Sequence, residues 1–193
     1  MNIIIEGLWF SPKERFIEQL AKNKPSWVDH IVPCPSISPT GDFKSWVTAL
    51  TRSCEQWRTR CSNDEIVVFE NSPQSITAYT KVTSRAEGSL GDSEHGLLES
   101  MIHGLSELLP KADVVILMLC KPLDVPERHT GLHQDMPLHV IEELQMSLVH
   151  WAESMRDNED TRVLAIAPPK KDQTWESWYK GTLYILEQIA SEQ

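Results

Sequence analysis

The chain has 193 residues, of which 40% are hydrophobic, and a formal net charge of −10 at pH 7. This length supports one hydrophobic core, so we expect a single domain over residues 1–193. The acidic balance argues against nucleic acid or an anionic lipid surface as the partner.

The sequence pattern predicts neither a membrane span nor a cleavable signal. No stretch approaches the ~20 apolar residues of a membrane span, and the first residues, MNIIIEG, do not resemble a cleavable signal. The four cysteines form no C-x-x-C pair and are expected to be reduced thiols. We therefore expect a cytoplasmic protein without a membrane span.

Five short apolar segments alternate along the chain with longer segments of helical period. The apolar segments, predicted to be buried strands, are NIIIE, HIVPC, EIVVFE, ADVVILMLC and RVLAIA. The amphipathic segments between them predict helices over 12–22, 43–60, 74–85, 93–109, 137–156 and 175–190. This order predicts an α/β fold, a parallel five-stranded sheet with helices on both faces. In the fifth helix, the face predicted to meet the sheet carries Val140, Leu144, Leu148 and Trp151.

The first strand and the following helix have the frame of a P-loop, G-x-x-x-x-G-K-[ST]. Only Gly7 and Lys13 fit that pattern. Pro12, which has no N–H to donate, occupies the second glycine position, and Glu14 occupies the position of the Mg²⁺-binding hydroxyl. The large side chains of the intervening Trp-Phe pair also fill the space that a phosphate needs. The phosphate cradle is therefore predicted to be degenerate.

The same residues match a helix capping box. In this interpretation the Ser11 hydroxyl accepts from the Glu14 amide and the Glu14 carboxylate reaches back. That carboxylate would sit at the positive end of the helix and repel a triphosphate about 4 Å away by roughly 4 kcal/mol per charge pair.

Four segments, taken together, resemble the deoxynucleoside kinase family, the relatives of cellular and viral thymidine kinases. IIIEG resembles the family's first strand, DHIVPCPS its V-x-P-E-P motif, and VVFENSPQS its E-R-S-P-x-S motif. Residues 122–151 resemble the lid, here 122–136, and the helix after it. EGL and SITAY are also similar to motifs of thymidylate kinase, the rival relative. The resemblance implies a P-loop nucleoside kinase-like fold.

Carried over position by position, the resemblance implies that much of the catalytic machinery is altered. Cys34 stands where the family has its glutamate base, and Asn71 stands where it has an arginine. Two later lid arginines are replaced by leucine and glutamine. The retained candidates are Glu70 and Arg128 as catalytic remnants, Gly7 and Lys13 for the cofactor, and Ser72 for the substrate.

Glu70, at the carboxyl end of a predicted strand, is the best surviving candidate, and the other four retained residues also have a purely structural interpretation. Gly7 can serve a tight turn, Lys13 a solvated first helical turn, Ser72 a helix N-cap and Arg128 a surface ion pair. The histidines at 129, 133 and 139 lie on a segment broken by glycine and proline, so we predict no metal site there.

These observations lead to a ranking of functions. The first is a pseudoenzyme of deoxynucleoside kinase fold that needs no cofactor and binds a protein partner, a second copy of itself or a nucleoside, as in a larger assembly. The alternatives are a divergent active deoxynucleoside (thymidine) kinase using ATP and Mg²⁺, and a nucleoside-binding sensor without ATP. None of the three involves nucleic acid.

Overall fold

The computed structural model describes residues 1–8, 11–34, 42–73, 75–76, 80, 90–106, 108–121, 137–159 and 161–192. The strands are β1 (Asn2–Gly7), β2 (His30–Val32), β3 (Val67–Glu70), β4 (Val114–Met118) and β5 (Arg162–Ile166). All are parallel, in the order β2-β3-β1-β4-β5. The predicted parallel five-stranded sheet is confirmed. β2 ends before Pro33, whose nitrogen cannot donate to a strand ladder.

The helices are α1 (Lys13–Lys22), α2 (Phe43–Arg60), α4 (Asp92–Ser106), α5 (Leu138–Glu159) and α6 (Trp175–Ser191). Their positions agree with the sequence predictions, except that α4 ends three residues earlier and α5 ends three residues later than predicted. Most of the predicted helix 74–85 lies outside the described residues, of which 75, 76 and 80 are helical. None of the described helices is long and apolar enough to cross a membrane.

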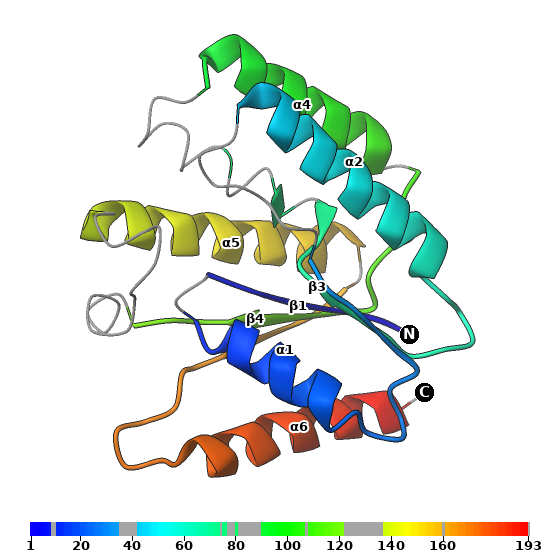
Figure 1. Cartoon of the computed structure of the whole chain (residues 1–193), viewed down its shortest axis with the longest axis vertical. Helices are drawn as coiled ribbons and strands as arrows, with labels where there is room; N and C mark the ends of the chain where they lie inside the picture. Colours follow the sequence, from blue (N-terminus) through cyan, green and yellow to red (C-terminus); the bar gives the residue numbers. More distant parts are fainter. Residues whose placement is uncertain are drawn as a thin grey trace.

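Helices cover both faces of the sheet (Figure 1). One face packs against α5 through a cluster that includes Ile4, Val115 and Leu144. The other face packs against α1 and α6 through Ile3, Phe16 and neighbouring apolar side chains. Alternate residues of β1 enter opposite clusters because side chains of a strand alternate between its two faces.

The inward face predicted for α5 is confirmed. Val140, Leu144 and Leu148 are buried in the first cluster and Trp151 packs against it. A third, smaller cluster joins α2 to α4 around Trp46 and Leu98, away from the sheet. In Figure 1 these two helices lie together at the top of the molecule.

Candidate functional site

Polar side chains gather where the three strands β2, β3 and β1 end. Glu6 lies next to the last residue of β1, Cys34 follows β2, and Glu70 and Asn71 stand at and just after the end of β3. Parallel register brings these ends to one edge of the sheet, the edge at which open α/β sheets bind ligands. Lys13, the first residue of α1, joins them there.

Lys13 is the cation of this cluster and is directed inward. Its side chain is only 3% exposed, and Nζ donates to Asn71 Oδ1 at 2.6 Å. The same nitrogen lies 3.8 Å from Glu70 Oε1. The solvated first turn considered from the sequence does not describe this lysine. Its ammonium group is instead bound by Asn71 and neutralised by the nearby Glu70 carboxylate.

Asn71 links this lysine to the end of β2. Its backbone φ is 64°, in the left-handed region that asparagine tolerates better than most residues. Its Nδ2 donates to Cys34 Sγ at 3.2 Å while its Oδ1 accepts from Lys13. A neutral amide therefore connects two elements at the position where the resemblance implies an arginine.

The Cys34 thiol is unsuited to act as a base. Burial raises its pKa to about 12, and the nearby positive charge of Lys13 only partly opposes that rise. The thiol therefore stays protonated near neutral pH. The backbone N–H of Cys34 donates to Glu70 Oε2 at 3.1 Å, so Glu70 is held from two sides.

Glu6 is the deepest ionisable group of the cluster. It is fully buried, and its Oε1 accepts from the Gly7 N–H at 3.0 Å. Burial raises its pKa, while the charge of Lys13 and a hydrogen bond from Ser75 act in the opposite direction. The buried carboxyl group of Glu6 thus lies against the turn that leads from β1 into α1, which we call the first corner (residues 7–13).

Three backbone amides in the described part of the first corner donate to acceptors of the chain itself. The Gly7 N–H donates to the preceding glutamate, and the Ser11 N–H donates to Leu8 O at 2.9 Å. The Lys13 N–H donates to Ser11 Oγ at 3.3 Å. A working P-loop presents such amides to phosphate. In the described part of this corner, these three donors already have partners.

The predicted capping box is wrong. The N-cap residue of α1 is Pro12, and no side chain caps it. The Ser11 hydroxyl instead donates to Leu8 O at 2.7 Å and accepts from the Lys13 amide. Because the helix begins at Lys13, Glu14 occupies the second helical position rather than the third, and its side chain is exposed. Its carboxylate therefore makes no hydrogen bond or ion pair with the described residues of this turn.

A reciprocal cap does occur at Ser72, the predicted substrate residue. Its Oγ accepts from the Ser75 N–H at 3.0 Å, and Ser75 Oγ accepts from the Ser72 N–H at 3.2 Å. Ser72 is fully buried. This geometry matches the N-cap interpretation of Ser72, because its hydroxyl oxygen accepts a hydrogen bond from the Ser75 backbone amide.

Gly7 is required by close packing. A Cβ at this position would lie 2.5 Å from Ser11 Oγ and 2.6 Å from the backbone oxygen of Met118. β1 and β4 are in register at these two residues, so the neighbouring strand fixes the distance. The tight-turn interpretation of Gly7 agrees with this contact.

Several sequence predictions lie outside the described residues. They are Arg128 and the rest of the predicted lid 122–136, the Trp9-Phe10 pair, and the histidines at 129 and 133. His139 is exposed at the start of α5. Of the retained candidates, the described site brings together Lys13 and Glu70 directly, and Gly7 and Ser72 through their interactions with Glu6, which is also near Lys13.

Sequence reasoning missed Glu6 and the pairing of Lys13 with Asn71. The sequence did contain a signal for this pairing. One lysine and two glutamates are placed at the same edge of the sheet, the glutamates at the ends of the adjacent strands β1 and β3. Because opposite charges attract, this arrangement predicts that the lysine side chain points toward the strand ends rather than toward solvent.

The raised pKa of Glu6 predicts a pH dependence of stability. A carboxyl whose folded pKa exceeds its ordinary value of 4.5 stabilises the fold fully below that value and loses this contribution as pH rises toward the folded pKa. Relative to the wild type, the Glu6→Gln variant should gain free energy of unfolding across this window, by at most about 1.4 kcal/mol per pH unit.

Urea unfolding of both proteins at several pH values from about 4.5 to 7.5 measures this difference. Glu18→Gln, at an exposed carboxylate of α1 that has no ion pair with any described residue, is the matched control. A difference between the wild type and Glu6→Gln that does not change with pH would contradict the assignment.

Comparisons with known proteins support the fold at low sequence identity. No protein-family model matches the chain, and no curated protein sequence matches it. Among solved structures, deoxyadenosine kinase from M. mycoides with the products dCMP and dCDP has a TM-score of 0.71 at 13% identity. The match covers 98% of this chain and 100% of that one. The same enzyme with bound dATP gives a TM-score of 0.70 at 14% identity, covering 97% and 100% of the two chains.

Thymidylate kinase from Candida albicans is also similar, with a TM-score of 0.64 at 14% identity. The match covers 100% of this chain and 93% of that one. Both relatives named from the sequence motifs thus recur among the similar structures. The chain has the deoxynucleoside kinase-like P-loop kinase fold.

Proposed function

We propose that this protein is a pseudoenzyme of the deoxynucleoside kinase fold, which transfers no phosphate and acts by binding. The observation that carries the proposal is the state of Lys13. Its side chain is 3% exposed, and its ammonium group donates to Asn71 and lies beside Glu70. In P-loop enzymes this lysine reaches the β- and γ-phosphates. Here a phosphate would have to displace two internal partners to recruit it.

The other positions that serve phosphoryl transfer in P-loop kinases also carry residues unsuited to that role. The three corner amides donate internally, and Pro12 has no N–H. The position of the Mg²⁺-binding hydroxyl carries the exposed Glu14, and the position of the base carries a protonated thiol, Cys34. Loss of one electrostatic group typically lowers kcat by ~10²–10³, and these groups act together. We therefore expect neither ATP nor Mg²⁺ as a cofactor.

The binding partner in this proposal is a protein, a second copy of the chain or a nucleoside. The exposed Tyr184 of α6, 61% accessible, supports a protein contact because tyrosine is enriched at protein interfaces. A cytoplasmic site of action agrees with the four cysteines, all of which are free thiols. The deoxyadenosine kinase structures contain deoxynucleotides, which supports testing deoxynucleosides as ligands.

Isothermal titration calorimetry with ATP and Mg²⁺, and separately with thymidine, deoxyadenosine and deoxycytidine, tests the proposal. We expect no saturable binding of ATP. A radiometric transfer assay in the presence of both substrates is expected to give no product above the protein-free rate. An active thymidine kinase under identical conditions is the positive control. Saturable binding of ATP together with accumulation of a deoxynucleoside monophosphate would overturn the proposal in favour of an active kinase.

A further inference from the structure

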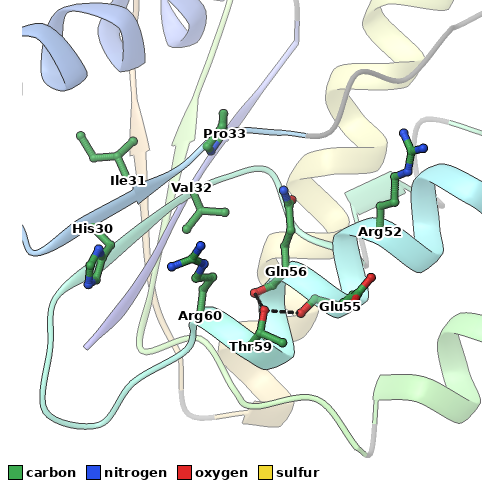
Figure 2. A pocket seen from close by; sticks show the side chains of 9 residues that line it. All are labelled: His30, Ile31, Val32, Pro33, Arg52, Glu55, Gln56, Thr59 and Arg60. Carbon is green, nitrogen blue, oxygen red and sulfur yellow. Dashed lines mark hydrogen bonds between the residues drawn. The ribbon is translucent and has the colours of Figure 1, made fainter.

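A polar groove runs between β2, at the edge of the sheet, and α2 (Figure 2). Its volume is about 590 Å³. β2 is the outermost strand in the sheet order, so only one side of its backbone pairs with another strand among the described residues. The residues lining the groove are His30, Ile31, Val32, Pro33, Arg52, Glu55, Gln56, Thr59 and Arg60.

Two arginines mark the ends of this groove. Arg52, Gln56 and Arg60 recur every four residues, so they share one side of α2, and about 12 Å of helix axis separates the two arginines. The side chain of neither arginine forms an ion pair or hydrogen bond with any described residue. Figure 2 shows the side chains of Gln56 and Arg60 on the side of α2 that faces β2, whereas Glu55 points away from β2.

The charge of this groove is opposite to that of the whole chain. The protein carries −10 at pH 7, yet two guanidinium groups that have no partner among the described residues line a single hollow. The His30 ring is the third basic group of the groove and already lies 3.6 Å from Glu65. Typical small-molecule pockets are mainly apolar, but most of the side chains here are polar. The expected occupant is therefore acidic and hydrophilic.

The edge of β2 adds a backbone recognition element. The His30 N–H donates to Ile66 O at 3.2 Å, so the backbone groups of His30 face β3. Successive residues of a strand alternate, and the N–H and C=O of Ile31 consequently face the outer edge, where the groove lies. Such groups can pair with an added strand.

We propose that this groove binds an extended, acidic segment of a protein partner. The segment would pair with the backbone of Ile31 and present two carboxylates, four residues apart, to Arg52 and Arg60. Four residues of extended chain span about 13 Å on one face, which matches the spacing of the two arginines. Bidentate arginine–carboxylate pairs would set the register. The groove lies on the outer edge of the sheet, apart from Lys13, so this proposal does not depend on the loss of phosphotransfer.

Fluorescence anisotropy with the full chain and labelled heptapeptides tests the groove. The probe is TEVTVET with blocked termini, together with a panel that keeps both glutamates and varies the other positions. We expect saturable binding that weakens at least about tenfold in the matched peptide TQVTVQT. Arg52→Gln and Arg60→Gln should each weaken binding about tenfold. Arg58→Gln, an exposed arginine of α2 outside the groove, should change it less than about twofold.

Backbone pairing is tested separately by N-methylation. In a paired strand only alternate peptide amides face the partner, so methylating one of two adjacent central amides should lower affinity about tenfold and methylating the other should not. Equal effects at both would overturn the strand pairing.

Three further outcomes would overturn the proposal. The first is no binding by any peptide of the panel. The second is binding that is unchanged in Arg52→Gln and Arg60→Gln. The third is that the groove binds small anions instead. In that case pyrophosphate would displace the labelled peptide at a lower concentration than the unlabelled peptide does, and it would bind more weakly to both variants. Circular dichroism of the Arg52→Gln, Arg58→Gln and Arg60→Gln variants verifies that each remains folded.

Discussion

Replacing Lys13 with methionine is expected to lower the free energy of unfolding by about 3 kcal/mol at pH 7. Methionine preserves most of the apolar stem and removes the ammonium group that binds Asn71 and lies beside Glu70. Removing one member of a buried charged pair typically costs ~3–5 kcal/mol, because it leaves the partner uncompensated. The partial exposure of Glu70, 17%, places the expected cost at the lower end. Urea denaturation followed by tryptophan fluorescence measures it.

The pH dependence of this variant identifies the cause of its instability. Lys13 lowers the pKa of Glu6, so removing Lys13 should raise the pKa of that buried carboxyl further. The variant should therefore lose stability more steeply than the wild type as pH rises from about 5 to 7.5. The double variant Lys13→Met/Glu6→Gln should recover part of the loss.

A control on the same helix separates this network from a general effect of losing a lysine. Lys22→Met, at the exposed last turn of α1, should cost less than about 1 kcal/mol. If Lys13→Met costs no more than Lys22→Met, the lysine is not held by the network, and the main support for the pseudoenzyme proposal is lost.

The sheet could be predicted because its signals are local and redundant. Apolar segments such as VVILM, in β4, form buried strands in almost any parallel arrangement, and the amphipathic spacing of Val140, Leu144 and Leu148 fixes the inner face of α5. Strand ends were less predictable. β2 and β4 are shorter than their apolar segments, because Pro33 and the exit of the chain from the sheet end the ladder.

The first corner could not be predicted because the two possible helix starts differ by one residue. Ser-Pro-Lys-Glu fits a capping box only if Ser11 is the N-cap. Leu8 O accepts from both the amide and the hydroxyl of Ser11, which fixes Ser11 in the preceding turn and moves the N-cap to Pro12. The sequence pattern contains no information on that competing acceptor. A carboxylate does face the corner, but it belongs to Glu6 rather than Glu14.

The polar cluster was partly predictable for a related reason. The resemblance identified Cys34 and Asn71 as altered positions, and the parallel topology places both near Lys13. The contacts that the replacement residues make, however, depend on side-chain geometry. The direct contact of the Asn71 amide with both the lysine and the thiol uses a left-handed backbone conformation that no sequence periodicity reports.

Replacing Gly7 with alanine is expected to destabilise the protein by about 3 kcal/mol. The new Cβ would lie 2.6 Å from the Met118 backbone oxygen and 2.5 Å from Ser11 Oγ. The serine side chain can rotate only by giving up its bond to Leu8 O, and the backbone oxygen belongs to a central strand of the sheet. Overpacking of this kind typically costs ~1–3 kcal/mol, and displacing sheet backbone brings it to the upper end. Thermal and urea unfolding measure the effect.

Gly181→Ala provides the matched control for the same chemical change. An added Cβ at Gly181 meets nothing within 4 Å, and this glycine lies inside α6. Alanine there should stabilise the protein by about 0.5–1 kcal/mol, because glycine is a poor helix former. The two variants thus move stability in opposite directions. If Gly7→Ala were as stable as the wild type, the corner would have room in front of β1, and the argument that it is closed to phosphate would fail together with the packing argument.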